Sequence, residues 1–127
     1  MTYVQGFLLA VPEARKAEYR QHAAASWAVF RRLGCLSVQE NLGVDGEPGK
    51  LTSFPQAVKL EEGEAVVFAW MIWPDRATHD AAWGRIMSDP ALRAEMGEEM
   101  PFDGARMMWG GFEPLFVAGD GGQPVAC

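Results

Sequence analysis

One pattern occurs twice in the chain and constrains its fold more than any other feature. An apolar run ends at Pro12 with Glu13 behind it, and a second apolar run ends at Pro74 with Asp75 behind it. Proline has no amide proton and is tolerated in the first turn of a helix, so each copy predicts a strand followed by a helix. The two prolines lie 62 residues apart, which indicates two similar halves.

Hydrophobic periodicity places the remaining elements. Strands are expected at residues 3–11, 35–43, 65–73 and 105–117, and helices at 12–34, 76–87 and 91–99. The order β-α-β-β-α-β predicts a ferredoxin-like α+β fold, in which a four-stranded antiparallel sheet carries its helices on one face. At this length, residues 1–117 are expected to form a single domain, followed by a flexible C-terminal tail at 118–127.

The connection between the second and third strands is unusually long. Residues 44–64 contain turn signals at Asp45-Gly46 and Pro48-Gly49 and are too irregular for one regular element. Connections of this length are often functional, although the sequence does not assign a role to this one.

The third predicted strand, 65–73, is apolar on both faces. Helices on one side of the sheet would leave its other face open to water, and soluble monomers rarely expose a large apolar patch. Two sheets packed face to face would bury that patch. We therefore expect a symmetric homodimer with roughly 1,000 Å² or more of buried surface.

Composition excludes several classes of protein. The net charge of −6 and the pI near 4.8 disfavour nucleic-acid binding. The sequence shows no leader and no apolar stretch long enough for a membrane span, so a cytoplasmic protein without a membrane partner is expected. Two cysteines and two histidines provide no zinc-type spacing, and no metal site is expected.

Four short motifs carry a resemblance to a known family. They are Thr52-Ser53-Phe54-Pro55, Val58-Lys59-Leu60, the run from Met100 to Gly104, and Gly110-Gly111-Phe112. With them, the chain from about Tyr3 to Val117 resembles the YbaA-like family of uncharacterised bacterial proteins, a domain of unknown function in the dimeric α+β barrel superfamily. The resemblance implies the fold and the homodimer and no established activity. Superfamily relatives include cofactor-free monooxygenases, haem-degrading enzymes and isomerases, and fold alone does not transfer those functions.

Asp103 and Arg106 are the first candidates for a binding site. An acid three residues before an arginine predicts either an ion pair at the entrance of the last strand or a fork that holds an anionic ligand. Asp103 before Gly104 is also typical of a plain turn. Both residues are retained as candidate substrate-binding groups.

Glu40 and His79 are the candidate catalytic groups. Glu40 falls on the apolar face of its strand, where a carboxylate must be paired, solvated in a cavity, or shifted in pKa in a way that suits a general base. A rim residue paired with a cation is the simpler interpretation. His79 lies one helical turn before Trp83, where a hydrogen-bonded structural histidine is commoner than a proton shuttle.

Aromatic and polar residues near the glycines and on the long connection could line a pocket. Trp109 and Phe54 are expected to meet a ligand or a dimer partner, and Ser53 and Lys59 supply a hydroxyl and a charge nearby. The glycines Gly110 and Gly111 indicate a bulge or a close approach rather than a phosphate loop, and no cofactor is expected.

These features support two hypotheses of different class. In the first, a homodimer binds a small, partly apolar molecule in a cavity between sheet and helices. Arg106 would orient an anionic group of that molecule, and Glu40 or His79 would move a proton. Monooxygenase or isomerase activity follows only by analogy with the superfamily. In the second, the homodimer is a non-enzymatic ligand-binding or structural protein in which Glu40 and Arg106 form a buried pair. A cavity with converging polar groups favours the first.

Overall fold

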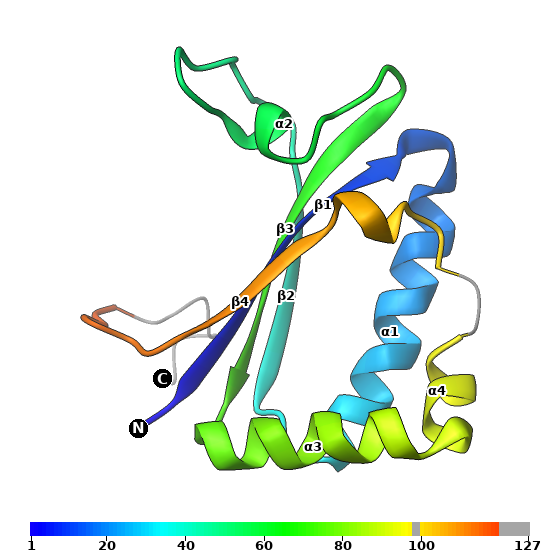
Figure 1. Cartoon of the computed structure of the whole chain (residues 1–127), viewed down its shortest axis with the longest axis vertical. Helices are drawn as coiled ribbons and strands as arrows, with labels where there is room; N and C mark the ends of the chain where they lie inside the picture. Colours follow the sequence, from blue (N-terminus) through cyan, green and yellow to red (C-terminus); the bar gives the residue numbers. More distant parts are fainter. Residues whose placement is uncertain (98–99, 120–127) are drawn as a thin grey trace, which may run out of the picture.

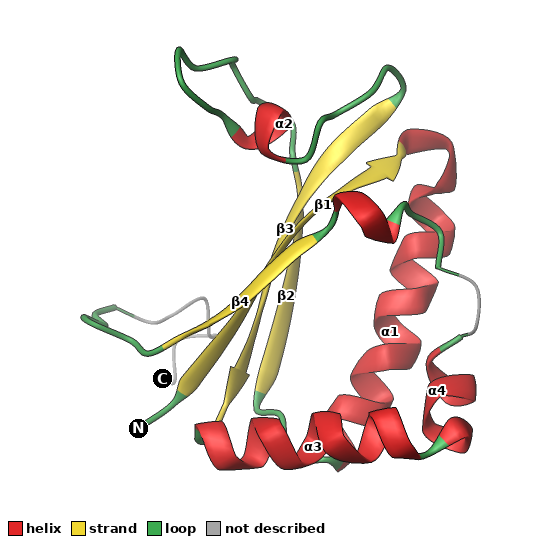
Figure 2. Cartoon of the chain, viewed as in Figure 1, coloured by secondary structure: helices red, strands yellow, loops and turns green. Residues whose placement is uncertain are grey.

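Four antiparallel strands form one sheet in the order β2-β3-β1-β4 (Figures 1 and 2). The computed structural model describes residues 1–97 and 100–119. The strands are β1 (Tyr3–Pro12), β2 (Ser37–Leu42), β3 (Glu64–Trp73) and β4 (Met108–Phe112). This order confirms the ferredoxin-like α+β fold predicted from the repeated strand-proline-helix pattern.

Within residues 1–97 and 100–119, four α-helices and two 3₁₀ turns connect the strands. They are η1 (Glu13–Arg15), α1 (Lys16–Arg32), α2 (Phe54–Ala57), α3 (Arg76–Ser88), α4 (Pro90–Met96) and η2 (Gly104–Arg106). The second proline-acid motif acts as predicted, because Asp75 Oδ1 accepts a hydrogen bond from the amide of Thr78 at 2.7 Å and caps α3. At the first motif, Pro12 still belongs to β1 and a 3₁₀ turn precedes the helix.

The main core lies between the sheet and the three longer helices. Val29 and Phe30 of α1, Ile86 of α3 and Leu92 of α4 pack against Trp73 of β3, which is fully buried. Figure 1 shows α1, α3 and α4 together on one side of the sheet. We call this side the helix face, and it is the one-sided cover that the sequence predicts.

A buried glutamine organises the part of this core around Trp73 and Trp83. Gln5 of β1 is 3% exposed, and its Oε1 accepts hydrogen bonds from the indole N–H groups of Trp73 at 3.2 Å and Trp83 at 3.1 Å. A single amide oxygen therefore satisfies two indole donors, which would otherwise be costly to bury.

The opposite face of the sheet, here called the open face, is only partly covered. Side chains alternate along a strand, so Ala10 and Val66 point away from the helix face, and Val58, just after α2, packs against them with no exposed surface. Farther along this face, Phe68, Met108 and Phe112 remain exposed. The short helix α2 thus covers part of the open face, on which no helix was expected.

The last strand is shorter than predicted. The sequence predicts a strand at 105–117, whereas residues 104–106 form the turn η2 and β4 ends at Phe112. Pro114 follows two residues later and has no amide proton for a sheet ladder, which explains the end of the strand. The predicted helix at 91–99 ends at Met96, with residues 98–99 outside the described chain, and most of the predicted tail, residues 120–127, also lies outside it.

Candidate functional site

The long connection between β2 and β3 encloses a hollow on the open face. Its helix α2 starts at Ser53, whose Oγ accepts a hydrogen bond from the amide of Gln56 at 3.2 Å, with Pro55 in the first turn. The hollow has a volume of about 350 Å³. We call it the α2 hollow, and it is lined by Glu13, Asn41, Leu42, Gly43, Val44, Asp45, Gly46, Phe54, Pro55, Leu60, Glu64, Ala65, Val66 and Phe68.

A second hollow of about 250 Å³ adjoins the first on the same face. We call it the β4 hollow, and it is lined by Gly6, Phe7, Leu8, Phe54, Phe68, Met108, Trp109, Gly110 and Phe112. Phe54 and Phe68 border both hollows, and their ring centroids are 5.7 Å apart. The two rings therefore form a shared wall, and the predicted pocket residues Phe54 and Trp109 lie together at the β4 hollow.

The α2 hollow combines apolar walls with acidic groups. Glu13, Asp45 and Glu64 are among its lining residues, and none of the lining residues is lysine, arginine or histidine. A hollow of this composition favours a ligand with an apolar body and hydrogen-bond donors or a positive charge over an anion.

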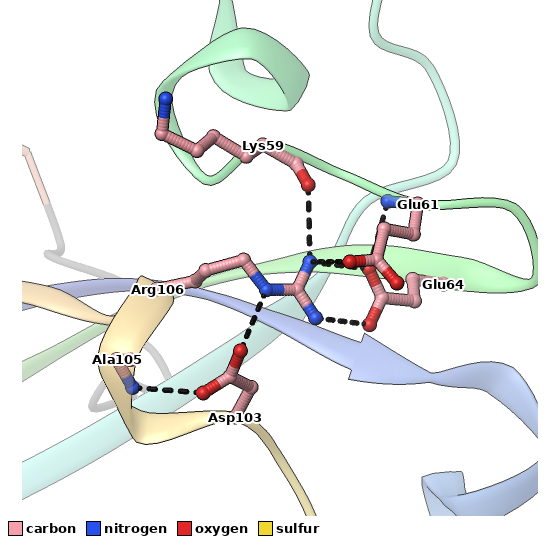
Figure 3. Close-up of polar contacts among 6 residues, drawn as sticks. All are labelled: Lys59, Glu61, Glu64, Asp103, Ala105 and Arg106. Carbon is pink, nitrogen blue, oxygen red and sulfur yellow. Dashed lines mark hydrogen bonds and ion pairs between the residues drawn. The ribbon is translucent and has the colours of Figure 1, made fainter.

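Arg106 is the centre of a polar cluster that fastens the end of the long connection to the sheet (Figure 3). Its guanidinium donates two parallel hydrogen bonds to the carboxylate of Glu64, each 2.7 Å long, one to the carboxylate of Asp103 at 3.0 Å and one to the carbonyl of Lys59 at 3.0 Å. The Arg106 and Glu64 side chains are only 14% and 10% exposed. Such bidentate pairs fix geometry as well as charge.

In this cluster, the predicted binding residues Asp103, Lys59 and Arg106 have structural roles. Asp103 Oδ1 also accepts from the amide of Ala105 at 3.0 Å and starts η2, as a turn residue would. The Arg106 guanidinium lowers the pKa values of both Glu64 and Asp103 by hydrogen bonding to their charged forms. Lys59 contributes its carbonyl and adopts a positive φ of 50°. Arg106 thus faces carboxylates of its own chain, and the prediction that it orients an anionic ligand has no support in this geometry.

Glu40 lies on the helix face, away from both hollows. It stands opposite Ala69 in the β2–β3 register, and its Oε1 accepts a hydrogen bond of 2.6 Å from the hydroxyl of Tyr19 on α1. Burial of the carboxyl group raises the pKa of Glu40, and burial together with the Glu40 charge raises the pKa of Tyr19. The predicted pair between Glu40 and Arg106 is therefore wrong, because each residue has a different partner.

Two further polar groups on α1 lie in the same layer and were not predicted. His22 Nδ1 and Ser26 Oγ are buried; Ser26 Oγ has no hydrogen-bond partner among the described residues, whereas the His22 ring interacts with the backbone of Met96. Burial lowers the pKa of His22, whose ring is 6.5 Å from that of Tyr19. The spacing of Tyr19, His22 and Ser26 on one helical face was the available sequence signal.

His79 is a packed histidine rather than a pocket residue. Its ring lies 4.7 Å from that of Tyr3 and 5.5 Å from that of Trp73, and Nδ1 is 2.8 Å from a carboxylate oxygen of Asp80. Its side chain is 12% exposed. These contacts account for the residue without a ligand.

The comparisons with known proteins decide the family. The model of DUF1428, a family of proteins of unknown function, matches residues 2–104. The protein YbaA of Escherichia coli K12, described as uncharacterized, is 47% identical over 115 residues, which cover 91% of this chain and 97% of that protein, and the YbaA of Shigella flexneri matches equally. The chain belongs to the DUF1428 family. The resemblance to YbaA-like proteins seen in the motifs is thereby confirmed.

One solved structure supports the fold of this DUF1428 protein. SnoaB of Streptomyces nogalater, a cofactor-independent oxygenase crystallised in a mutant form, aligns over 91% of this chain and 93% of its own with a TM-score of 0.51 and 20% identity. At that identity the likeness shows a shared fold and no shared activity.

The candidate residues of this DUF1428 protein therefore occupy separate places. The two hollows lie on the open face, whereas Glu40 and His79 lie on the helix face, so the prediction of one cavity between sheet and helices that unites them is not met. Within residues 1–97 and 100–119, no group of three acidic, histidine or cysteine side chains is placed to hold a metal ion, and no helix is long and apolar enough to cross a membrane.

Proposed function

We propose that the protein is a homodimer that binds a small, partly apolar molecule in the α2 hollow. The observation that carries the proposal is the hollow itself. Its volume of about 350 Å³ falls within the range of roughly 300–1,000 Å³ typical of ligand pockets, whereas the β4 hollow of about 250 Å³ falls below it. The α2 hollow also has polar groups at its edge that could orient a ligand.

The charge of the α2 hollow narrows the ligand class. Glu13 and Asp45 are exposed acidic residues in its lining, and the Arg106 guanidinium, which holds the lining residue Glu64, is also bound to Asp103. An aromatic or aliphatic amine therefore fits better than a carboxylate of the same size, since the acidic groups attract a positive charge and repel a negative one.

The dimer belongs to the same proposal. Phe68, Met108 and Phe112 are exposed large apolar residues on the open face. Soluble monomers rarely leave such a surface uncovered, and a symmetric pair of open faces would bury it. We place the dimer in the cytoplasm, in agreement with the buried free thiol of Cys35, and the net charge of −6 disfavours a nucleic-acid partner.

Fluorescence titration with the neutral dye N-phenyl-1-naphthylamine tests the ligand site. The dye should brighten on binding, 2-naphthylmethylamine should displace it at lower concentration than 2-naphthoate, and Phe68→Ala should weaken binding. Phe68 is partly exposed, so this variant should still fold, which circular dichroism verifies. Met87→Ala, on the exposed side of α3, is the matched control. No dye binding, or equal binding by wild type and Phe68→Ala, would refute the site.

A second candidate function rests on the Tyr19–Glu40 hydrogen bond. Glu40 is exposed at the surface of the sheet, and its carboxyl group, which accepts a hydrogen bond from the Tyr19 phenol and has a raised pKa, is suited to act as a general base for a substrate that binds there. It would remove a proton from an acidic C–H group of a substrate. The resulting enolate would react with dioxygen in an oxygenase or take the proton back at another carbon in an isomerase.

Oxygen uptake and proton exchange test this second function without a known substrate. The purified protein is incubated in deuterated buffer with a panel of phenols and 1,3-diketones while dissolved oxygen is recorded. The hypothesis predicts oxygen consumption or deuterium incorporation that falls at least about tenfold in Glu40→Gln, the scale expected when general-base catalysis is lost. Equal rates in wild type and Glu40→Gln would rule out this role of Glu40 and leave the ligand site on the open face intact.

A further inference from the structure

We propose that residues 113–117 form an arm that crosses the dimer and lies in the β4 hollow of the partner protomer. This inference rests on the proposed homodimer and deepens it, since the arm would complete a wall of the ligand site. It follows from two features that are unexplained within one chain, an exposed apolar segment and an exposed apolar hollow.

The arm begins where β4 ends. Leu115, Phe116 and Val117 are 100%, 86% and 74% exposed, and no other stretch of the described residues places three successive large apolar side chains so fully in solvent. Pro114 precedes them and stops the ladder with β1. In Figure 1 the chain after β4 runs outward on the side of the sheet that is opposite to α1, α3 and α4. The arm therefore projects from the open-face side.

The β4 hollow has the chemistry to receive such a segment. Its lining consists of apolar side chains and two glycines, with no charged residue among them. It is smaller than a typical ligand pocket, and one phenylalanine ring with an aliphatic neighbour suits its volume of about 250 Å³. The α2 hollow, with its acidic edge, suits the arm less well.

A second copy of this chain is the occupant that the geometry favours. Five extended residues span roughly 16 Å, and sheets that pack face to face lie about 10 Å apart, so an arm leaving β4 is long enough to reach a facing sheet. In a two-fold dimer, one arm that reaches the hollow of the facing protomer implies the same contact for the second arm. Each chain then supplies both the segment and its binding surface.

The arm has a consequence for the ligand site. Phe54 and Phe68 separate the two hollows and are themselves partly exposed. An apolar side chain of the partner's arm packed behind these rings would hold them in place and close the α2 hollow on that side. Ligand binding would therefore depend on the partner chain, and the site would be incomplete in a monomer.

Photo-cross-linking in isotopically mixed dimers tests the arm directly. The variant Phe116→p-benzoylphenylalanine is prepared at natural isotope abundance, mixed with ¹⁵N-labelled wild type to allow subunit exchange, irradiated and digested for mass spectrometry. We expect a ¹⁴N arm peptide joined to a ¹⁵N peptide from the β4 hollow, namely residues around Gly6–Leu8, Phe68 or Met108–Phe112. Met87→p-benzoylphenylalanine, on α3, should give no such product. Cross-links only within one chain, cross-links elsewhere, or none would overturn the proposal.

A second variant separates this inference from the proposed function. Leu115→Ser with Phe116→Ser removes two apolar groups of the arm, and neither contributes to the core of its own chain, so the fold should persist. The dimer dissociation constant should rise at least about tenfold, which is the change expected if only one of the two side chains is buried at the interface. N-phenyl-1-naphthylamine should also bind more weakly. Unchanged dimerisation and dye binding would refute the arm and leave the ligand site standing. The expected cross-links together with no dye binding to the wild type would support the arm and refute the ligand site.

Discussion

Arg106 and Glu64 meet through two parallel hydrogen bonds of 2.7 Å between guanidinium and carboxylate, although 42 residues separate them in the sequence. The pair joins the turn before β4 to the start of β3 and, through the carbonyl of Lys59, holds the end of the long connection. It therefore supports one side of the α2 hollow, to which Glu64 belongs.

Breaking this pair from one side should destabilise the protein more than removing both partners. Arg106→Leu leaves the Glu64 carboxylate largely buried without its counter-ion, whereas Arg106→Leu with Glu64→Leu leaves neither charge. We expect the double variant to unfold at a higher urea concentration than Arg106→Leu. Urea unfolding curves of the wild type, both single variants and the double variant provide the cycle. Additive losses would show that the two side chains do not interact energetically.

The same pair should contribute to stability in a defined pH range. Arg106 lowers the pKa of Glu64 below 4.5, its ordinary value, so the folded state releases this proton more readily than the unfolded state. The stabilisation is complete above pH 4.5 and is lost as the pH falls through the depressed pKa. Melting temperatures recorded between about pH 3 and pH 7 should fall more steeply on the acid side for wild type than for Glu64→Gln. Parallel curves would contradict this assignment.

Glu40 should show the opposite pH dependence. Burial raises its pKa above 4.5, so the folded state binds this proton more tightly than the unfolded state, and stability falls as the pH rises through that interval. Glu40→Gln keeps an oxygen acceptor for the Tyr19 hydroxyl and removes the charge. The melting temperature of Glu40→Gln relative to wild type should therefore increase between about pH 4 and pH 7. A constant difference across this range would show that the Glu40 carboxyl is fully solvated.

Gly111 and Gly110 provide a matched pair in β4. A Cβ atom at Gly111 would overlap the hydroxyl group of Tyr3, whereas one at Gly110 would meet nothing closer than 3.5 Å, a ring carbon of Phe112. Gly111→Ala should cost about 1–3 kcal/mol because the Tyr3 ring, which packs against His79, must shift, and Gly110→Ala should cost less than about 1 kcal/mol. Chemical unfolding measures both. Equal losses would contradict the proposed role of Gly111 as space for Tyr3.

Gln5 should be sensitive to loss of its acceptor oxygen. Gln5→Leu leaves the indole donors of Trp73 and Trp83 unpaired in the core, at about 1–3 kcal/mol for each buried donor. Gln39→Leu, on the exposed part of β2, is the control and should have little effect. Near-ultraviolet circular dichroism should report the altered tryptophan environments. A Gln5→Leu protein as stable as Gln39→Leu would show that these hydrogen bonds contribute nothing.

The sequence was sufficient for the elements whose signals are local. Proline followed by an acid marked the ends of β1 and β3, and periodicity marked α1 and the apolar strand β3, because caps and faces depend on neighbours within a few residues. The overprediction of the last strand had a local cause as well. Leu115, Phe116 and Val117 are the residues of a strand by type, but Pro114 separates them from the ladder.

The site depended on long-range contacts, which the sequence could not supply. Glu40 was placed on the correct face of its strand, yet Tyr19, its partner, lies on another element. Arg106 was expected to serve a ligand because Glu64, its main partner, is 42 residues away and gave no local signal. The α2 hollow requires the long connection to fold back over the open face, as the packing of Val58 against Ala10 and Val66 shows, and these contacts are distant in sequence.

Native mass spectrometry of gently purified protein reports both assembly and retained ligand in one spectrum. We expect a species of twice the 13.9 kDa chain mass that carries an additional small molecule, with the added mass reduced or absent in Phe68→Ala. A bare monomer would contradict the dimer and the ligand site together, and a dimer that retains the same molecule equally in wild type and Phe68→Ala would contradict the assignment of that site to the α2 hollow.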